Sequence, residues 1–178
     1  TEYDVAEAAG YEPEKRGHLE AQIANAADEL AYTAHDLDDG LRSGLVSPSQ
    51  LAGLALWERL RREAKHNAGV LDDLTRHRMI RDLIGIEVTD VIEATEARLC
   101  SSGVRSADAL QRLPNIVVAF TQGLETENRQ LKDFLFHNLY QHHRVVRMQM
   151  KAERFVANLF QAYVEKPEIL PREVQGRA

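Results

Sequence analysis

Residues 27–41 read ADELAYTAHDLDDGL, and the spacing of apolar side chains in and around this stretch decides the fold class. An α-helix turns by about 100° per residue, so residues three, four and seven positions apart lie on one face. The pattern predicts a helix over residues 13–42 with one apolar stripe, formed by Leu19, Ile23, Leu30, Ala34, Leu37 and Leu41. This helix therefore has one face that can pack against a core.

Helical periodicity continues along the rest of the 178-residue chain. Ser47 followed by Pro48 has the residue types of a helix N-cap and first turn, so a second helix is predicted to begin there. Four more helices are predicted over the ranges 73–100, 106–113, 124–142 and 144–164. The strand-like stretch is 116–118, where β-branched side chains favour an extended backbone. We therefore expect an all-α, bundle-like fold with at most one short strand.

Two details of these predicted helices can be checked against a structure. Ser106 is placed to cap the short helix, which Pro114 would end. The helix over 73–100 offers seven apolar side chains for burial, namely Leu74, Ile80, Leu83, Ile84, Val88, Val91 and Ile92.

Composition and charge narrow the class of protein. Hydrophobic residues make up 44% of the chain and charged residues 28%, which is typical of a soluble globular domain with one core. The net charge of −6 argues against a broad surface for nucleic acid or anionic membrane, because both need a basic face. An acidic site can still take a polyphosphate through a bound divalent cation.

The single cysteine, Cys100, excludes an internal disulfide and a Cys-rich zinc site. We therefore expect an intracellular, cytoplasmic protein. No run approaches the roughly 18 apolar residues that a membrane-spanning helix needs. The chain does not begin with Met, and its N-terminal residues read as a loop, so we expect the sequence to be part of a longer polypeptide.

The face opposite the apolar stripe of the first helix is polar. With Asp28 at 0°, this face spans about −20° to about 80°, whereas the leucine and isoleucine side chains of the apolar stripe lie at about 180–220°. It carries Asp28, Tyr32, His35, Asp36 and Asp39. No Lys or Arg offsets the repulsion between these acids, and a bound cation or a hydroxyl-rich ligand would remove it. A solvated face explains the same pattern, so the residues alone leave both interpretations open.

Two of these acids are too far apart to hold one metal ion. Asp28 and Asp36 are eight residues apart, which places their Cα atoms about 12 Å apart on a helix. Metal–oxygen bonds are only about 2.0–2.6 Å long. One acid can therefore bind a metal while the other accepts a hydrogen bond from a ligand. Tyr32 lies between them and suits packing against a sugar or a base.

Three segments share their pattern with one known family. They are LEAQIANAADELAYTAHDLDDGLRSGL at 19–45, LKDFLFHNLYQHHRV at 131–145 and KAERFVANLFQAYVEKPEILP at 151–171. Together they resemble the HD-domain deoxyguanosinetriphosphate triphosphohydrolase (dGTPase-like) family. The resemblance covers essentially the whole chain. It implies that residues 1–178 form the C-terminal part of an HD-domain-like helical bundle, with the family's His and His-Asp metal ligands N-terminal to it.

The resemblance also implies an activity. Such enzymes hydrolyse a deoxynucleoside triphosphate (dNTP) to the deoxynucleoside and triphosphate, with a divalent metal ion, Mg²⁺ or Mn²⁺, as cofactor. We expect a dNTP substrate, with dGTP favoured, and a homo-oligomer, and we expect no membrane or nucleic-acid partner. The catalytic histidine would lie outside this chain, so we expect the 178 residues alone to have little or no activity.

Roles for the first helix follow from the same resemblance. Asp28 matches the last metal ligand of the family. Asp36 matches an acid that receives the sugar 3′-hydroxyl, and Tyr32 matches a tyrosine beside the deoxyribose. The pair His35-Asp36 has the same residue types as the family's His-Asp metal ligands, but it stands at a different position in the chain.

The second motif supplies the other predicted binding residues. Lys132 matches a basic residue that faces the triphosphate, and Tyr140 and Gln141 match residues near the sugar and base. A continuous helix would place Lys132, Phe136 and Tyr140 on one face. The resemblance assigns no catalytic residue to this chain.

Two other functions fit the same residues. An all-α regulatory or interaction module without chemistry would need none of the proposed site residues. Another HD-superfamily phosphohydrolase, acting on a nucleoside monophosphate or a cyclic nucleotide, would use a similar metal site. Product analysis separates these functions, because only the dGTPase-like reaction releases triphosphate.

Overall fold

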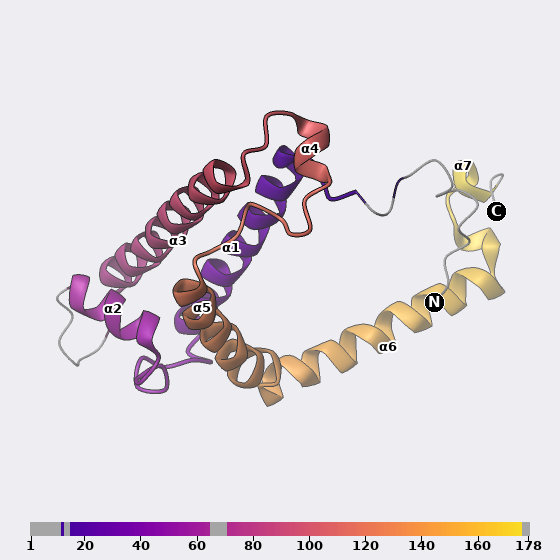
Figure 1. Cartoon of the computed structure of the whole chain (residues 1–178). Helices are drawn as coiled ribbons and strands as arrows, with labels where there is room; N and C mark the ends of the chain where they lie inside the picture. Colours follow the sequence, from indigo (N-terminus) through magenta and orange to yellow (C-terminus); the bar gives the residue numbers. More distant parts are fainter. Residues whose placement is uncertain (1–11, 13–14, 65–70, 176–178) are drawn as a thin grey trace. The chain divides into compact units, whose positions relative to one another are not determined.

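The computed structural model describes residues 12, 15–64 and 71–175, and these residues form helices and no strand (Figure 1). The predicted all-α fold is therefore confirmed. The predicted N-terminal loop lies largely outside the described residues. Within the described residues no helix is both long and apolar enough to cross a membrane. The chain divides into two compact units, Thr1–Leu135 and Phe136–Ala178, which are described in turn.

Five helices of the described residues build the first unit. They are α1 (Leu19–Arg42), α2 (Ala55–Glu63), α3 (Asp73–Ser102), α4 (Ala107–Gln111) and α5 (Gln122–Leu135). Helix α3 returns alongside α1 in the opposite direction, and α4 lies near the start of α1 (Figure 1). The backbone N–H of Arg16 donates to the Gln111 carbonyl across 2.8 Å and fixes this end. Both α1 and α2 pack against α3 and α5.

The apolar stripe of α1 faces this core as predicted, apart from its N-terminal part. Leu30, Ala34 and Leu37 are buried, and Leu19 and Leu41 are half-buried. Ile23 is 49% exposed. At this end of α1 the buried side chain is the polar one of Gln22, one residue earlier.

Two predicted helix starts are wrong. α1 begins at Leu19, where the ring Nδ1 of the N-cap residue His18 accepts from the Ala21 N–H at 3.2 Å. Ser47 does not cap a helix: its backbone N–H donates to Oε1 of Gln50 (2.9 Å), as that of an N-cap residue would, but residues 48–50 form only a turn. Gly53 then adopts a φ of 94°, so α2 begins only at Ala55.

The starts of α3 and α4 agree better with the prediction from the sequence. Asp72 caps α3 by accepting from the Thr75 N–H at 2.8 Å. Ser106 caps α4 as predicted, accepting from the Ala109 N–H at 3.2 Å. Gly103 ends α3 with a φ of 64°.

The face that α3 buries was predicted only in part. Leu83 and Val91 are buried and Ile80 is half-buried, but the other four candidates are exposed: Leu74, Ile84, Val88 and Ile92. Helix α3 is apolar on two faces, so periodicity alone does not say which one packs inward. The buried face also holds two charged residues, Arg76 and Glu87. Arg76 is ion-paired with Asp38 (2.8 Å) and with Asp73 (2.6 Å).

The predicted strand at 116–118 is an irregular segment instead, in which Val117 and Val118 are buried and Ile116 is exposed. Its backbone groups bond to side chains rather than to a neighbouring strand. The N–H groups of Val117 and Val118 donate to Oε1 of Gln22 at 2.9 and 3.3 Å. The guanidinium of Arg98 donates to the carbonyls of Val117, Ala119 and Phe120. These two side chains satisfy the peptide groups that a strand would have paired.

The second unit begins with a change of helix type. Residues Phe136–Tyr140 form a π-helical turn, in which the Gln141 N–H donates to the Phe136 carbonyl five residues back (3.1 Å). The predicted single helix over 124–142 is therefore wrong beyond Leu135, and the ideal 100° spacing no longer applies there.

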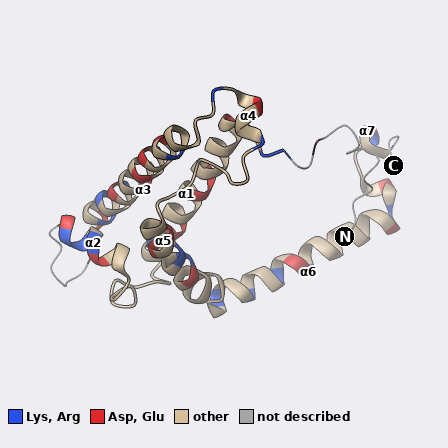
Figure 2. Ribbon diagram, viewed as in Figure 1, with Lys and Arg blue, Asp and Glu red and all other residues tan. Residues whose placement is uncertain are grey.

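The rest of the second unit is built on one long helix. Helix α6 (His143–Glu165) carries its Lys and Arg residues in its first half, at Arg144, Arg147, Lys151 and Arg154 (Figure 2). It has no buried residue. It is followed by a 3₁₀ turn (Pro167–Ile169) and the short helix α7 (Arg172–Gln175). The predicted helix over 144–164 agrees with α6 to within one residue at each end.

Candidate functional site

The polar face of α1 is open to solvent. Asp28, Tyr32, His35 and Asp39 are exposed, Asp36 is half-buried, and Tyr32 is 61% exposed. The opposite face of the same helix is buried in the core. The structure therefore keeps Asp28, Tyr32 and Asp36 together on one accessible face.

Asp28 has the properties of one metal ligand among several. Its side chain makes no hydrogen bond or ion pair with any residue that the structure describes. Its exposed carboxylate is the hard oxygen donor that Mg²⁺ and Mn²⁺ prefer. In the described ranges no three His, Cys, Asp or Glu side chains gather into a metal site. Asp28 thus fits a metal site only if further ligands come from outside these ranges.

An ion pair joins α5 to α1 at the edge of the polar face of α1. The ammonium of Lys132 is paired with the carboxylate of Glu29, the residue directly after Asp28. The Glu29 side chain is 57% exposed and that of Lys132 is 38% exposed. The structure thus pairs Lys132, a predicted triphosphate ligand, with the residue that follows the predicted metal ligand in the chain. The partner itself was not predicted, because Glu29 lies 103 positions away and no local pattern links the two.

Behind this ion pair lies a buried acid that the sequence reasoning missed. Glu87 on α3 is fully buried, and Asn128 on α5 is 3% exposed. Burial raises the pKa of the Glu87 carboxyl to about 7, and the Glu29 carboxylate adds to the rise. The adjoining Asn128 side chain and the Lys132 ammonium oppose it. Glu87 therefore exchanges a proton in the neutral pH range.

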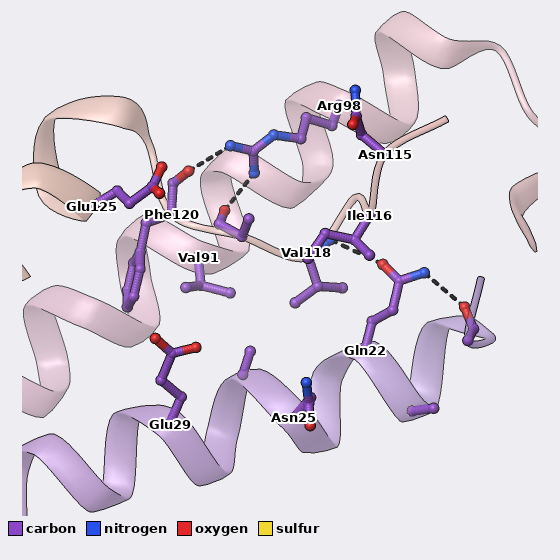
Figure 3. Close-up of a pocket in the computed structure, with 14 residues that line it drawn as sticks. Gln22, Asn25, Glu29, Val91, Arg98, Asn115, Ile116, Val118, Phe120 and Glu125 are labelled. Atoms are coloured by element: carbon purple, nitrogen blue, oxygen red, sulfur yellow. Dashed lines mark hydrogen bonds between the residues drawn. The ribbon is translucent and has the colours of Figure 1, made fainter. Parts of the chain in front are cut away.

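A cleft opens between α1, α3 and the segment that follows α4. It has a volume of about 680 Å³, within the range of small-molecule sites. Figure 3 shows Asn25 and Glu29 projecting toward it from α1, opposite Phe120. Arg98 also lines the cleft, but its guanidinium is held by backbone carbonyls. Since Glu29 lines this cleft and pairs with Lys132, the cleft adjoins the ion pair.

Tyr140 and Gln141 belong to the second unit. Tyr140 is half-buried at the end of the π turn, and Gln141, directly after it, is exposed. π turns recur at functional sites, because they change the direction of side chains within a helix. The roles predicted for these two residues rest on the sequence pattern.

Comparison with known proteins identifies relatives for nearly the whole chain. Residues 118–178 match a family described as the phosphohydrolase-associated domain. A deoxyguanosinetriphosphate triphosphohydrolase-like protein of Geobacter sulfurreducens is 45% identical over 161 residues, which are 89% of this chain and 42% of that protein.

Two more proteins with the same description extend the comparison. The one from Ralstonia nicotianae is 44% identical over 89% of this chain and 41% of its own length. The one from Deinococcus deserti is 39% identical over 91% of this chain and 43% of its own length. The chain therefore spans about two fifths of the length of these relatives.

Proposed function

Because the chain belongs to the family of deoxyguanosinetriphosphate triphosphohydrolase-like proteins, we propose that the protein hydrolyses dNTPs to a deoxynucleoside and triphosphate. The observation that carries this proposal is the 45% identity to such a protein over 89% of the chain. The open polar face of α1 and the nearby Lys132 give this region groups suited to sugar, metal and phosphate.

The polar face of α1 would hold the metal and the sugar. Asp28 would be one ligand of Mg²⁺ or Mn²⁺, with the other ligands outside the described residues. When bound, such a metal polarises a phosphate oxygen and makes the phosphorus easier for water to attack. Asp36 would accept a hydrogen bond from the 3′-hydroxyl, and Tyr32 would pack against the deoxyribose.

Lys132 would exchange one anionic partner for another. Its present partner, Glu29, is largely exposed, and exposed ion pairs contribute only about 0–1 kcal/mol. A triphosphate offers several charged oxygens to the same ammonium, and charge-assisted hydrogen bonds to phosphate are among the stronger ones. The substrate would therefore take Lys132 from Glu29 at little free-energy cost.

The remaining parts of the proposal concern the second unit and the assembly. Tyr140 and Gln141 would lie near the sugar and the base, as their match to the family motif implies. The preferred substrate would be dGTP, and the working protein would be a homo-oligomer. Each of these statements can be checked separately from the reaction itself.

Product analysis tests the reaction. The whole polypeptide that carries this chain is incubated with Mn²⁺ and each of the four dNTPs, and the products are separated by ion-exchange chromatography. Release of deoxynucleoside and triphosphate is the expected result. Intact dNTPs throughout would contradict it and favour a regulatory or interaction module. Hydrolysis of monophosphates or cyclic nucleotides alone would point to a different phosphohydrolase.

A further inference from the structure

Helix α3 presents a second apolar stripe, which is open to solvent. Ile84, Val88 and Ile92 follow one another at intervals of four residues, so they share one face of the helix. They are 39–60% exposed, whereas Leu83, on the opposite side of the helix, is fully buried. Single exposed apolar side chains are normal on a protein surface, but a row of them is typical of a contact surface.

Charges of opposite sign stand at the two ends of this stripe. Arg78 and Arg81 precede it and Glu96 follows it, and all three side chains are exposed. With Val88 at 0°, Arg81 lies at about 20° and both Arg78 and Glu96 lie at about 80°, so the three charges share one edge of the exposed face. None of them forms an ion pair within the part of the chain that the structure describes. The face therefore has a basic end and an acidic end, and neither is neutralised by these residues.

This arrangement of charges is complementary to itself. Suppose that two copies of α3 pack antiparallel, with Val88 on the two-fold axis. Each residue before Val88 then lies opposite the residue that follows Val88 by the same distance in the other copy, so Ile84 meets the partner's Ile92. Arg81 stands seven residues before Val88 and Glu96 eight residues after it, so they face each other at both ends of the contact.

The opposite orientation lacks this complementarity. Two parallel copies of α3 would place Arg81 against Arg81 and Glu96 against Glu96, and like charges that face each other across an interface are unfavourable. The charges on α3 thus favour one orientation of one partner, a second copy of the same helix. Another segment of the whole polypeptide lying on the stripe would leave this match between the two ends of α3 unused.

Gly85 lets a second helix approach closely. It lies on the same exposed face, at about 60°, and a Cβ atom built on it would meet no heavy atom within 4 Å. Glycine in the middle of a helix costs about 1 kcal/mol relative to alanine, and a close contact with another backbone offsets such a cost. Beside it lies an open groove of about 470 Å³ between α2 and α3, which Arg81 and Gly85 help to line. This space can accept side chains from a partner helix.

We propose that the exposed face of α3 is a contact surface between two copies of this chain, packed antiparallel with Val88 on the two-fold axis. The apolar stripe supplies the buried area, and Arg78 and Arg81 of each copy pair with the partner's Glu96. The inference deepens the homo-oligomer named in the proposed function, on which it rests, and it does not depend on the reaction.

A disulfide cross-link tests the position of the axis. Val88→Cys is made in the whole polypeptide together with Cys100→Ser, which removes the exposed cysteine of this chain. After mild oxidation, digestion and mass spectrometry should detect a peptide joined to its own copy through position 88, because a disulfide needs Cα atoms within about 7 Å. Thr89→Cys alters an exposed residue about 100° away around the helix and should stay unlinked. No link through position 88, or equal yields from both variants, would overturn the proposal.

An exchange of charges tests the pairing, and it remains decisive if the cysteine variants fold poorly. Arg78→Glu/Arg81→Glu and Glu96→Arg each place like charges at both ends of the contact, whereas an equal mixture of the two proteins restores opposite charges at both ends. In sedimentation velocity, each variant alone should associate about tenfold more weakly than the wild type, and the mixture should recover. Glu93→Arg changes an exposed acid outside the face and should behave as the wild type. A monomeric wild type, or a mixture that associates no better than its components, would refute the pairing.

Failure of the inference and failure of the proposed function look different. A protein that releases triphosphate from dNTPs but does not link through position 88 would refute the contact and leave the reaction standing. A protein that links through position 88 but leaves every dNTP intact would support the contact and refute the reaction.

Discussion

The ammonium of Lys132 on α5 is paired with the carboxylate of Glu29 on α1, which lies 103 positions earlier in the chain. This pair joins the two segments that carry the predicted metal and phosphate ligands. Both partners also act on the pKa of the buried Glu87 carboxyl: Glu29 raises it and Lys132 lowers it.

Changing Glu29 should strengthen the binding of polyphosphate. Glu29→Gln removes the anion that competes for Lys132, so affinity for tripolyphosphate should rise about two- to fivefold, the worth of an exposed ion pair. Lys132→Met should lower affinity about tenfold, because it removes a charged hydrogen bond to phosphate. Calorimetry at low ionic strength measures both. A fall in affinity with Glu29→Gln would mean that Glu29 itself helps to bind the ligand.

Glu87 should make stability depend on pH. Its pKa is about 7 in the folded protein against 4.5 ordinarily, so the folded state binds the extra proton between these values. The free energy of unfolding should therefore fall as pH rises from about 4.5 to about 7, by about 3 kcal/mol in total, and stay level above. Urea denaturation gives the free energies of unfolding of the wild type and of Glu87→Gln. The difference between these two free energies should change by this amount over the same pH range. A difference that stays constant with pH would contradict the prediction.

Gln22 should be important for the packing of the 114–121 segment. Gln22→Leu leaves the N–H groups of Val117 and Val118 without their acceptor, which should lower the free energy of unfolding by about 2–3 kcal/mol. Gln130→Leu, on the exposed face of α5, should change it by less than about 0.5 kcal/mol. Thermal denaturation distinguishes the two variants, and equal effects would show that the amide of Gln22 is dispensable.

Arg76 should stabilise the contact between α1 and α3. Arg76→Met leaves Asp38 without its cation across the helix interface, and breaking a buried pair destabilises by about 3–5 kcal/mol. Because Asp38 is partly exposed, the loss should lie at or below the lower end of this range. The matched variant Arg78→Met alters an exposed position two residues away and should have little effect. Similar melting temperatures for the two variants would refute the assignment.

Local sequence patterns account for the features that depend on neighbouring residues. The amphipathic α1 and the cap at Ser106 follow from residue types a few positions apart. Ser47 has the residue type of an N-cap, but the residues after it form turns, with Gly53 at a positive φ, and the local sequence does not reveal this. The segment at 116–118 has the side chains of a strand, but Gln22 and Arg98 bind its backbone from distant positions.

Features that depend on contacts between residues far apart in the chain could not be predicted from the sequence. Helix α3 has two apolar faces, so its pattern cannot say that Glu87 points inward. The pairing of Glu29 with Lys132 requires α1 and α5 to meet, which no local spacing encodes. Asp28, Tyr32 and Asp36 were placed on one face by helical geometry, and the structure keeps that face open. Their roles in the reaction stay predictions.

A matched pair of aspartate variants tests the central claim, that α1 supplies a metal ligand to a dNTP triphosphohydrolase. Asp28 and Asp39 are exposed on the same polar face, and only Asp28 is predicted to be a metal ligand. Bound Mn²⁺ and triphosphate release from dGTP are measured in the whole polypeptide carrying Asp28→Ala or Asp39→Ala. The account predicts that Asp28→Ala loses both the metal and the activity, while Asp39→Ala retains most of each. Equal losses from the two variants, or full activity in Asp28→Ala, would contradict it.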